Sequence, residues 1–206
     1  MSEQTRIQLY QQQTGAKPVI EGVIPIVIAD GAKKKLALDF IAWLRENKMQ
    51  PQWGGLIQSW QWKFNYKSKT ILIITMSENG WIDYEESSWF VIPLPYPYND
   101  IKKHSEAIIK NNLRGIIQNN QCFCVHKNKD GRTGVGCDPQ KACAGGMTKN
   151  VFDRDIEGIC CGGGSERPNT RFYDPGETEI YCIKKLLELE KKARDDEAAV
   201  KKIEVK

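Results

Sequence analysis

The chain has 206 residues, enough to bury about 70% of the surface of the unfolded chain in a hydrophobic core. Its formal net charge of +4 is too small to indicate a nucleic-acid-binding protein by itself. No charged and apolar leader is visible, and no apolar run approaches the roughly 20 residues that span a bilayer, so we expect a cytoplasmic protein without a membrane segment. In a reducing compartment, its seven cysteines are expected to be metal ligands, reactive thiols or buried apolar residues rather than disulfide partners.

The surplus of positive charge lies in the second half of the chain. Residues 1–100 carry ten basic and ten acidic side chains, residues 101–175 carry twelve and eight, and the remainder carries eight of each. Thiolates bound to a metal would balance this surplus, and a weak anion-binding role is the alternative.

The first part of the chain is predicted to be an arm, a strand and a helix. Residues 1–19 are polar, rich in glutamine and without periodicity. The run VIPIVIADG predicts a short strand with Pro25 near its start. Asp30 is then a candidate N-cap for an amphipathic helix within ADGAKKKLALDFIAWLRENKMQ. The apolar face of this helix consists of Leu36, Ala37, Phe40, Ile41 and Leu44.

Three strands are predicted in the middle of the chain. The stretch SWQWKFNYK alternates strictly, with Trp60, Trp62, Phe64 and Tyr66 on one face and polar residues on the other. After a short polar break, TILIITM is more continuously apolar and is expected to pair with it as a hairpin. A third strand is predicted at SWFVIPL, and the prolines of PLPYPYND should end the sheet.

A second helix is predicted over IKKHSEAIIKNNLRGIIQNN, with Asn99 or Asp100 as its N-cap. Its isoleucine and leucine residues fall on one face, and His104 lies at the edge of that face. A histidine in this place is expected to be a partly buried core residue rather than a ligand.

A closing helix is predicted from DPGETEIYCIKKLLELEKKARDD, with Asp174 as the cap and Pro175 at the first helical position. Cys182 lies beside the apolar stripe and is expected to be a buried thiol. The charged tail EAAVKKIEVK is expected to fray. The inward-facing residues are Ile180, Ile183, Leu186 and Leu187.

Together these elements predict an α+β fold. It consists of a small, mostly antiparallel sheet covered by helices, with a cysteine-rich zinc-binding insertion before the C-terminal helix. The boundaries that follow are a flexible N-terminal arm at 1–19, an α+β core at 20–120, a cysteine-rich metal-binding segment at 121–173, and a C-terminal helix packed on the core, with its charged tail, at 174–206.

The six cysteines between residues 122 and 161 are the main chemical signal. Four thiolates about 2.3 Å from a zinc ion make a closed tetrahedral site, which stabilises segments that bury too little apolar surface alone. The spacing lacks a C-x-x-C pair, so buried or free thiols without a metal, and an iron-sulfur cluster or redox thiol pair, are alternatives to structural zinc. The preferred ligands are Cys124, Cys137, Cys143 and Cys160, with Cys122, Cys161 and His126 as alternates.

Parts of the chain resemble an uncharacterised family of cytosolic proteins from clostridia and related Firmicutes. The resemblance is carried by IADGAKKKLALDFIAWLRENKMQPQW, SWQWKFNYKSKTILIITM, CAGGMTKNVFDRDIEGICC and CIKKLLELEKKAR, within residues 23–194. It implies the same order of helix, Trp-bearing hairpin, helix, cysteine cluster and closing helix in a cytosolic protein. It implies no activity.

The features of the sequence suggest three possible functions. The first is a small-molecule-binding or regulatory module, with Trp60, Trp62 and Trp89 as pocket residues unless they are simply core. The second is a metal- or thiol-dependent enzyme, in which His126 lowers the pKa of the Cys124 thiol. The third and weakest is nucleic-acid binding through the basic cysteine-rich half. The sequence favours a binding module over an enzyme and leaves the ligand and oligomeric state open.

Overall fold

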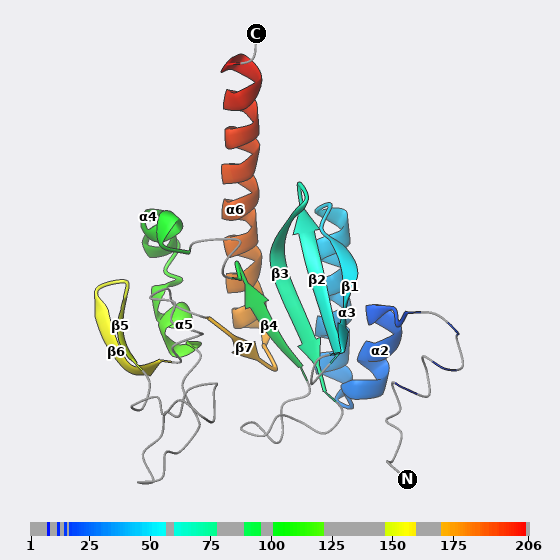
Figure 1. Cartoon of the computed structure of the whole chain (residues 1–206). Helices are drawn as coiled ribbons and strands as arrows, with labels where there is room; N and C mark the ends of the chain where they lie inside the picture. The colour runs from blue at the N-terminus through cyan, green and yellow to red at the C-terminus, as the bar shows by residue number, and fades with distance from the viewer. Residues whose placement is uncertain are drawn as a thin grey trace, which may run out of the picture.

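The computed structural model describes residues 17–56, 60–77, 89–95, 101–121, 147–159 and 170–204, together with Gln8, Gln12 and Gly15. This part of the chain forms an α+β fold, as the sequence predicts (Figure 1). A five-stranded antiparallel sheet has the order β1-β2-β3-β4-β7, and a separate hairpin is formed by β5 and β6. The elements are α2 (Ile20–Val27), α3 (Gly31–Glu46), β1 (Gln50–Leu56), β2 (Trp60–Tyr66), β3 (Lys69–Met76), β4 (Trp89–Pro93), the 3-10 helix η1 (Ile101–His104), α4 (Ser105–Lys110), α5 (Arg114–Asn119), β5 (Met147–Val151), β6 (Arg154–Ile159), β7 (Phe172–Tyr173) and α6 (Glu177–Glu204).

The strand predicted at VIPIVIADG is wrong, because this run forms the helix α2. A continuous apolar run has the same appearance in a buried strand and in a buried helix, so periodicity does not separate the two. Pro25 lies inside the helix and removes one N–H donor. The burial of apolar side chains on one side of α2 compensates for the missing backbone hydrogen bond. The buried residues Ile20, Val23, Ile24 and Val27 follow helical spacing.

The helix predicted after this run is confirmed as α3. Asp30 is its N-cap, and the Asp30 Oδ1 atom accepts a hydrogen bond from the Lys33 backbone N–H at 2.7 Å. Its buried face is apolar, with Ala37, Phe40, Ile41 and Leu44 fully buried and Leu36 partly buried against the same core.

The β2–β3 hairpin and β4 are confirmed. In register, Trp60 lies opposite Met76, which lies opposite Trp89 on β4. Side chains on alternate residues of β2 are buried as predicted, because one face of this strand meets the helices. The strand predicted at SWFVIPL is β4, and it ends at Pro93. This is the beginning of the proline-rich stretch that is expected to end the sheet.

The two-residue turn of this hairpin is strained. Lys67 and Ser68 have φ angles of 48° and 63°, the left-handed values that a type I′ turn requires and that Asn-Gly normally supplies. An ordinary residue in this conformation costs about 1–2 kcal/mol, whereas glycine adopts it freely.

Substituting Ser68→Gly is therefore expected to raise the free energy of unfolding by about 1 kcal/mol, measured by urea denaturation. Ser68→Ala is the matched control, because it removes the same hydroxyl without relieving the positive φ. An equal gain in both variants would contradict the explanation from backbone strain.

Four of the described strands are absent from the prediction, namely β1, β7 and the two strands of the β5–β6 hairpin. β1 is an edge strand that carries Pro51 and a bulge between Trp53 and Gly55, so its sequence lacks the usual strand signal. β7 has only two residues, and its pairing of Phe172 with Val91 depends on tertiary context.

The single helix predicted over 101–120 is wrong, because the chain is divided there into η1, α4 and α5. Asn112 has a φ of 55° and ends α4. The backbone N–H of Leu113 donates to Ile108 O and that of Asn112 donates to Ile109 O, as in a Schellman motif. The predicted caps Asn99 and Asp100 lie outside the described residues.

The closing helix is confirmed as α6, but its predicted ends are wrong. It begins at Glu177, and the predicted cap Asp174 instead bonds to Trp89: its Oδ1 accepts from the Trp89 N–H at 3.1 Å and its own N–H donates to Trp89 O at 2.9 Å. The expected fraying after residue 196 is not observed, since α6 continues to Glu204.

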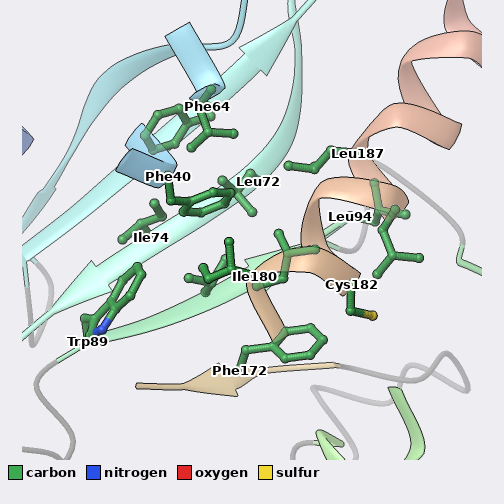
Figure 2. Close-up of a cluster of buried hydrophobic side chains, with 14 of the residues drawn as sticks. Phe40, Phe64, Leu72, Ile74, Trp89, Leu94, Phe172, Ile180, Cys182 and Leu187 are labelled. Carbon is green, nitrogen blue, oxygen red and sulfur yellow. The ribbon is translucent and has the colours of Figure 1, made fainter. Parts of the chain in front are cut away.

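The core lies between one face of the sheet and the helices α3 and α6. Figure 2 shows Phe40 from α3, Phe64 from β2, Trp89 from β4 and Phe172 from β7 gathered with Ile180 from α6. The predicted inward residues of α6, Ile180, Ile183, Leu186 and Leu187, are all buried. Val151, Ile156 and Ile159 of the β5–β6 hairpin belong to the same cluster.

Candidate functional site

The residues predicted as zinc ligands lie outside the described residues, so the structure does not place them. These residues are Cys122, Cys124, His126, Cys137, Cys143, Cys160 and Cys161. Within the described ranges, no group of three or more His, Cys, Asp or Glu side chains is positioned to hold a metal ion. The zinc site stays a prediction from the sequence.

The two ends of the cysteine-rich segment meet at one point on the core. Gln121 forms an antiparallel bridge with Thr170, and the Arg171 N–H donates to Asn120 O at 2.8 Å. The Gln121 Nε2 atom donates to Thr170 Oγ1 at 3.0 Å and to Ile117 O at 2.7 Å. Gln121 and Thr170 are 3% and 4% exposed. We name the Gln121–Thr170 bridge with these hydrogen bonds the clasp.

The β5–β6 hairpin is attached to α5, the helix that contains Ile117. Gln118 on α5 is buried, and its Nε2 atom donates to Val151 O at 2.7 Å and to Phe152 O at 3.3 Å. Met147 and Ile159 are Cα partners at the open end of this hairpin. The clasp and the hairpin turn are therefore both hydrogen-bonded to α5, the clasp through Ile117 O and the turn through Gln118.

The three tryptophans predicted as pocket residues lie on one face of the sheet. Trp60 and Trp62 alternate on β2, and Trp89 lies two strands away with Met76 between it and Trp60. All three side chains are buried, and the Trp62 Nε1–H donates to Pro18 O at 3.2 Å. The half-buried Trp53 contacts both β2 tryptophans, with ring centroids 5.5 Å and 5.3 Å away. This burial fits the core alternative, and ligand binding by these residues stays a prediction.

A buried charge cluster lies where α6 meets η1 and the β2–β3 turn. Its centre is Glu190, which is 2% exposed. The Glu190 Oε1 atom accepts from Arg194 Nε at 2.8 Å, and Oε2 accepts from His104 Nε2 at 2.9 Å and from Lys103 Nζ at 2.7 Å. Burial raises the pKa of Glu190, but the hydrogen bonds and positive charge of its partners outweigh this effect and lower the pKa from 4.5 to about 2.

The guanidinium of Arg194 joins this cluster to the sheet. Arg194 is 6% exposed, and its Nη1 donates to Tyr66 O at 2.7 Å and to Lys69 O at 2.9 Å. Its Nη2 donates to Thr70 O at 3.2 Å. These carbonyls lie beside the register shift in the β2–β3 ladder. Arg194 therefore fastens α6 to the hairpin through backbone acceptors as well as through Glu190.

His104 is buried, as the sequence indicates, and it is 8% exposed. Its Nε2 bond to the ionised carboxylate of Glu190 makes that nitrogen the donor. The role of His104 in the described structure is to satisfy a buried carboxylate.

Cys182 is the cysteine that the structure describes, and it is fully buried in the core beside Phe172 (Figure 2). Burial, with a smaller contribution from the Glu179 charge, raises the pKa of its thiol to about 12. Its thiol therefore stays protonated and unreactive at neutral pH.

A small pocket of about 150 Å³ lies between the β2–β3 turn and the distal half of α6. Two of its cationic groups are neutralised by carboxylates, because Lys67 Nζ lies 2.5 Å from Asp195 and Arg194 is bound to Glu190. This charge balance gives the pocket no clear preference for an anion or a cation. Its lining residues are Lys67, Lys69, Arg194, Glu197 and Ala198.

Comparison of the chain with protein-family models, with curated proteins and with solved structures gave no match. Among the residues that the structure describes, no helix has the length and apolar character needed to cross a membrane.

Proposed function

We propose that this chain is a non-enzymatic binding or regulatory module whose cysteine-rich segment is held in shape by a structural zinc ion. The proposed ligands are Cys124, Cys137, Cys143 and Cys160. The proposal is supported by the composition of the segment, which has six cysteines and few large apolar side chains. The β5–β6 hairpin contributes Val151, Ile156 and Ile159 to the core, but residues 122–146 contain few large apolar side chains. This part would gain little from hydrophobic burial, and four zinc–thiolate bonds would supply the missing free energy.

The observation that carries the proposal is the way the described parts of the segment are anchored. The clasp holds residues 121 and 170 together, and the hairpin holds Met147 opposite Ile159. Cys160 follows Ile159 directly, and Cys143 precedes Met147 by four residues, a span of at most about 14 Å. Cysteines that are distant in sequence are therefore tethered to neighbouring points, which favours convergence on one ion.

Two side chains of reactive types within the described residues have structural roles. Cys182 is a core thiol with a raised pKa, and His104 is committed to Glu190. Neither side chain is arranged as a nucleophile or as an exposed general base.

We expect the purified protein to contain one zinc ion per chain, measured by inductively coupled plasma mass spectrometry. Substituting Cys143→Ser should abolish stoichiometric zinc binding, because three thiolates hold the ion far more weakly than four. Cys182→Ala is the matched control, since this thiol lies in the core and should not affect the zinc content.

Iodoacetamide labelling tests the same proposal independently. The thiolates of the segment should resist alkylation until a chelator removes the metal. A metal-free protein with one rapidly alkylated cysteine at neutral pH would contradict the proposal and would favour a thiol enzyme.

A further inference from the structure

We propose that the pocket between the β2–β3 turn and the distal half of α6 binds a small zwitterion, with free α-amino acids of about the size of alanine as the chemical class of ligand. The inference goes beyond the proposed function, because the lining residues given above lie outside the cysteine-rich segment. The observation that carries it is a cation and a carboxylate, those of Lys69 and Glu197, that line one pocket without forming an ion pair with each other.

The walls of the pocket come from two elements. On α6, Glu197 and Ala198 follow Arg194 by three and four residues, the spacing that places side chains on one face of a helix. Lys67 in the turn and Lys69 at the start of β3 supply the other wall. A molecule in the pocket therefore meets charged side chains from both the helix and the hairpin.

The buried guanidinium of Arg194 fixes these two walls relative to each other. It donates to the backbone carbonyls of Tyr66 and Lys69, at 2.7 Å and 2.9 Å, and to Glu190 Oε1 at 2.8 Å. The pocket is thus formed before a ligand enters it. A preformed site loses less conformational entropy on binding, which favours occupation by a small molecule.

The charges that line the pocket differ in whether they are already neutralised. Lys67 and Arg194 are each paired with a carboxylate, as described above. Within the described part of the chain, Lys69 Nζ and the Glu197 carboxylate form no ion pair, either with each other or with another side chain. A ligand with one negative and one positive group complements both, whereas a simple anion or cation complements only one of them.

The volume of the pocket sets the size of the ligand. A cavity of about 150 Å³ binds benzene, a molecule of about six non-hydrogen atoms. Alanine has as many. In the proposed complex its carboxylate is directed to Lys69, its ammonium group to Glu197 and its methyl group to Ala198.

The expected affinity is low, because Lys69 and Glu197 are both exposed. Ion pairs formed by solvent-accessible side chains contribute little, since water and salt screen them. We therefore expect a dissociation constant in the millimolar range and weaker binding at higher ionic strength. A site of this affinity responds to changes in a ligand that is present at millimolar concentration.

An NMR titration of the full-length protein with L-alanine tests the proposal. Propionate and ethylamine are the matched probes, because each keeps one charged group of alanine and lacks the other. Alanine should shift the amide signals of Lys69 and Ala198, with saturation at tens of millimolar, and should leave the signal of the buried Val23 in α2 unchanged. Propionate and ethylamine should each bind about fivefold more weakly.

Two pairs of variants test the position of the site. Ala198→Leu fills the pocket without changing the charge and should abolish the saturable shifts, whereas Ala199→Leu, at an exposed position outside the lining, should bind alanine like the original chain. Glu197→Gln should weaken alanine binding about fivefold. Asp196→Asn makes the same change of charge beside the pocket and should have little effect. Leucine is a good helix former, so α6 is retained in the alanine variants.

Each outcome supports or overturns a defined part of the proposal. Propionate or ethylamine that binds as tightly as alanine would overturn the assignment of a zwitterion. Unchanged alanine binding by Ala198→Leu, or equal weakening by Glu197→Gln and Asp196→Asn, would overturn the assignment of the pocket. The absence of any saturable shift with alanine would overturn the proposal as a whole. Zinc content is measured separately, so alanine binding by a zinc-free chain would contradict the proposed zinc site alone.

Discussion

Replacing Arg194 by methionine is expected to lower the free energy of unfolding by about 3–5 kcal/mol, because it leaves a buried carboxylate without its guanidinium partner. The same change removes the donors to three backbone carbonyls, those of Tyr66, Lys69 and Thr70. Methionine fills a similar volume, so the loss reports lost polar contacts more than a cavity. Urea denaturation at neutral pH measures the effect.

A matched control is Lys35→Met, which breaks an ion pair with Asp39 whose side chains are 77% and 58% exposed. Such exposed pairs contribute little to stability, so this substitution should leave the free energy of unfolding nearly unchanged. Arg194→Lys keeps the charge but loses the planar fork of donors, so its loss should be intermediate. A loss below about 1 kcal/mol for Arg194→Met would refute the view that this guanidinium fastens α6 to the hairpin.

The stability of the protein is also expected to fall steeply in acid because of Glu190. Its pKa is about 2 in the folded chain against an ordinary value of 4.5, so the unfolded state takes up the proton first as the pH falls. The contribution is complete above pH 4.5 and is lost as the pH falls towards 2. A difference of this size corresponds to about 3 kcal/mol.

The Glu190→Gln variant isolates this contribution from the other carboxylates. It should be less stable than the original chain at pH 6, and the gap should close by about 3 kcal/mol between pH 5 and pH 2. The groups facing Glu190 are Lys103 and His104 from η1, and Arg194 from α6. Parallel pH profiles for the two proteins would show that these partners do not hold Glu190 ionised.

A helix or strand is predicted correctly from the sequence where one physical signal dominates. The strict alternation from Trp60 to Tyr66 indicates a half-buried strand, and the Asp30 cap with an apolar stripe indicates α3. The apolar run of α2 was assigned to the wrong element because both strand and helix bury such a run completely. β1 was missed because edge position and a bulge permit the proline and glycines that a central strand excludes.

The buried charge cluster was also missed, for a different reason. Charged residues on a helix are usually solvated, so charge alone gives no sign in the sequence that Glu190 and Arg194 of α6 are buried. Their spacing contained the signal, since Ile183, Leu187, Glu190 and Arg194 follow one another at intervals of three or four and continue one stripe. Sequence alone does not reveal that backbone carbonyls of a distant turn lie opposite that stripe.

The form of β1 has a consequence for how this protein behaves at high concentration. An outermost strand with a regular row of N–H and C=O groups invites a second molecule to extend the sheet, which is a common first step towards fibrils. Pro51 lacks an N–H, and the register shift at Gly54 breaks the regular repeat. A neighbouring molecule would meet an interrupted row of partners along β1, and growth of the sheet from this side is disfavoured.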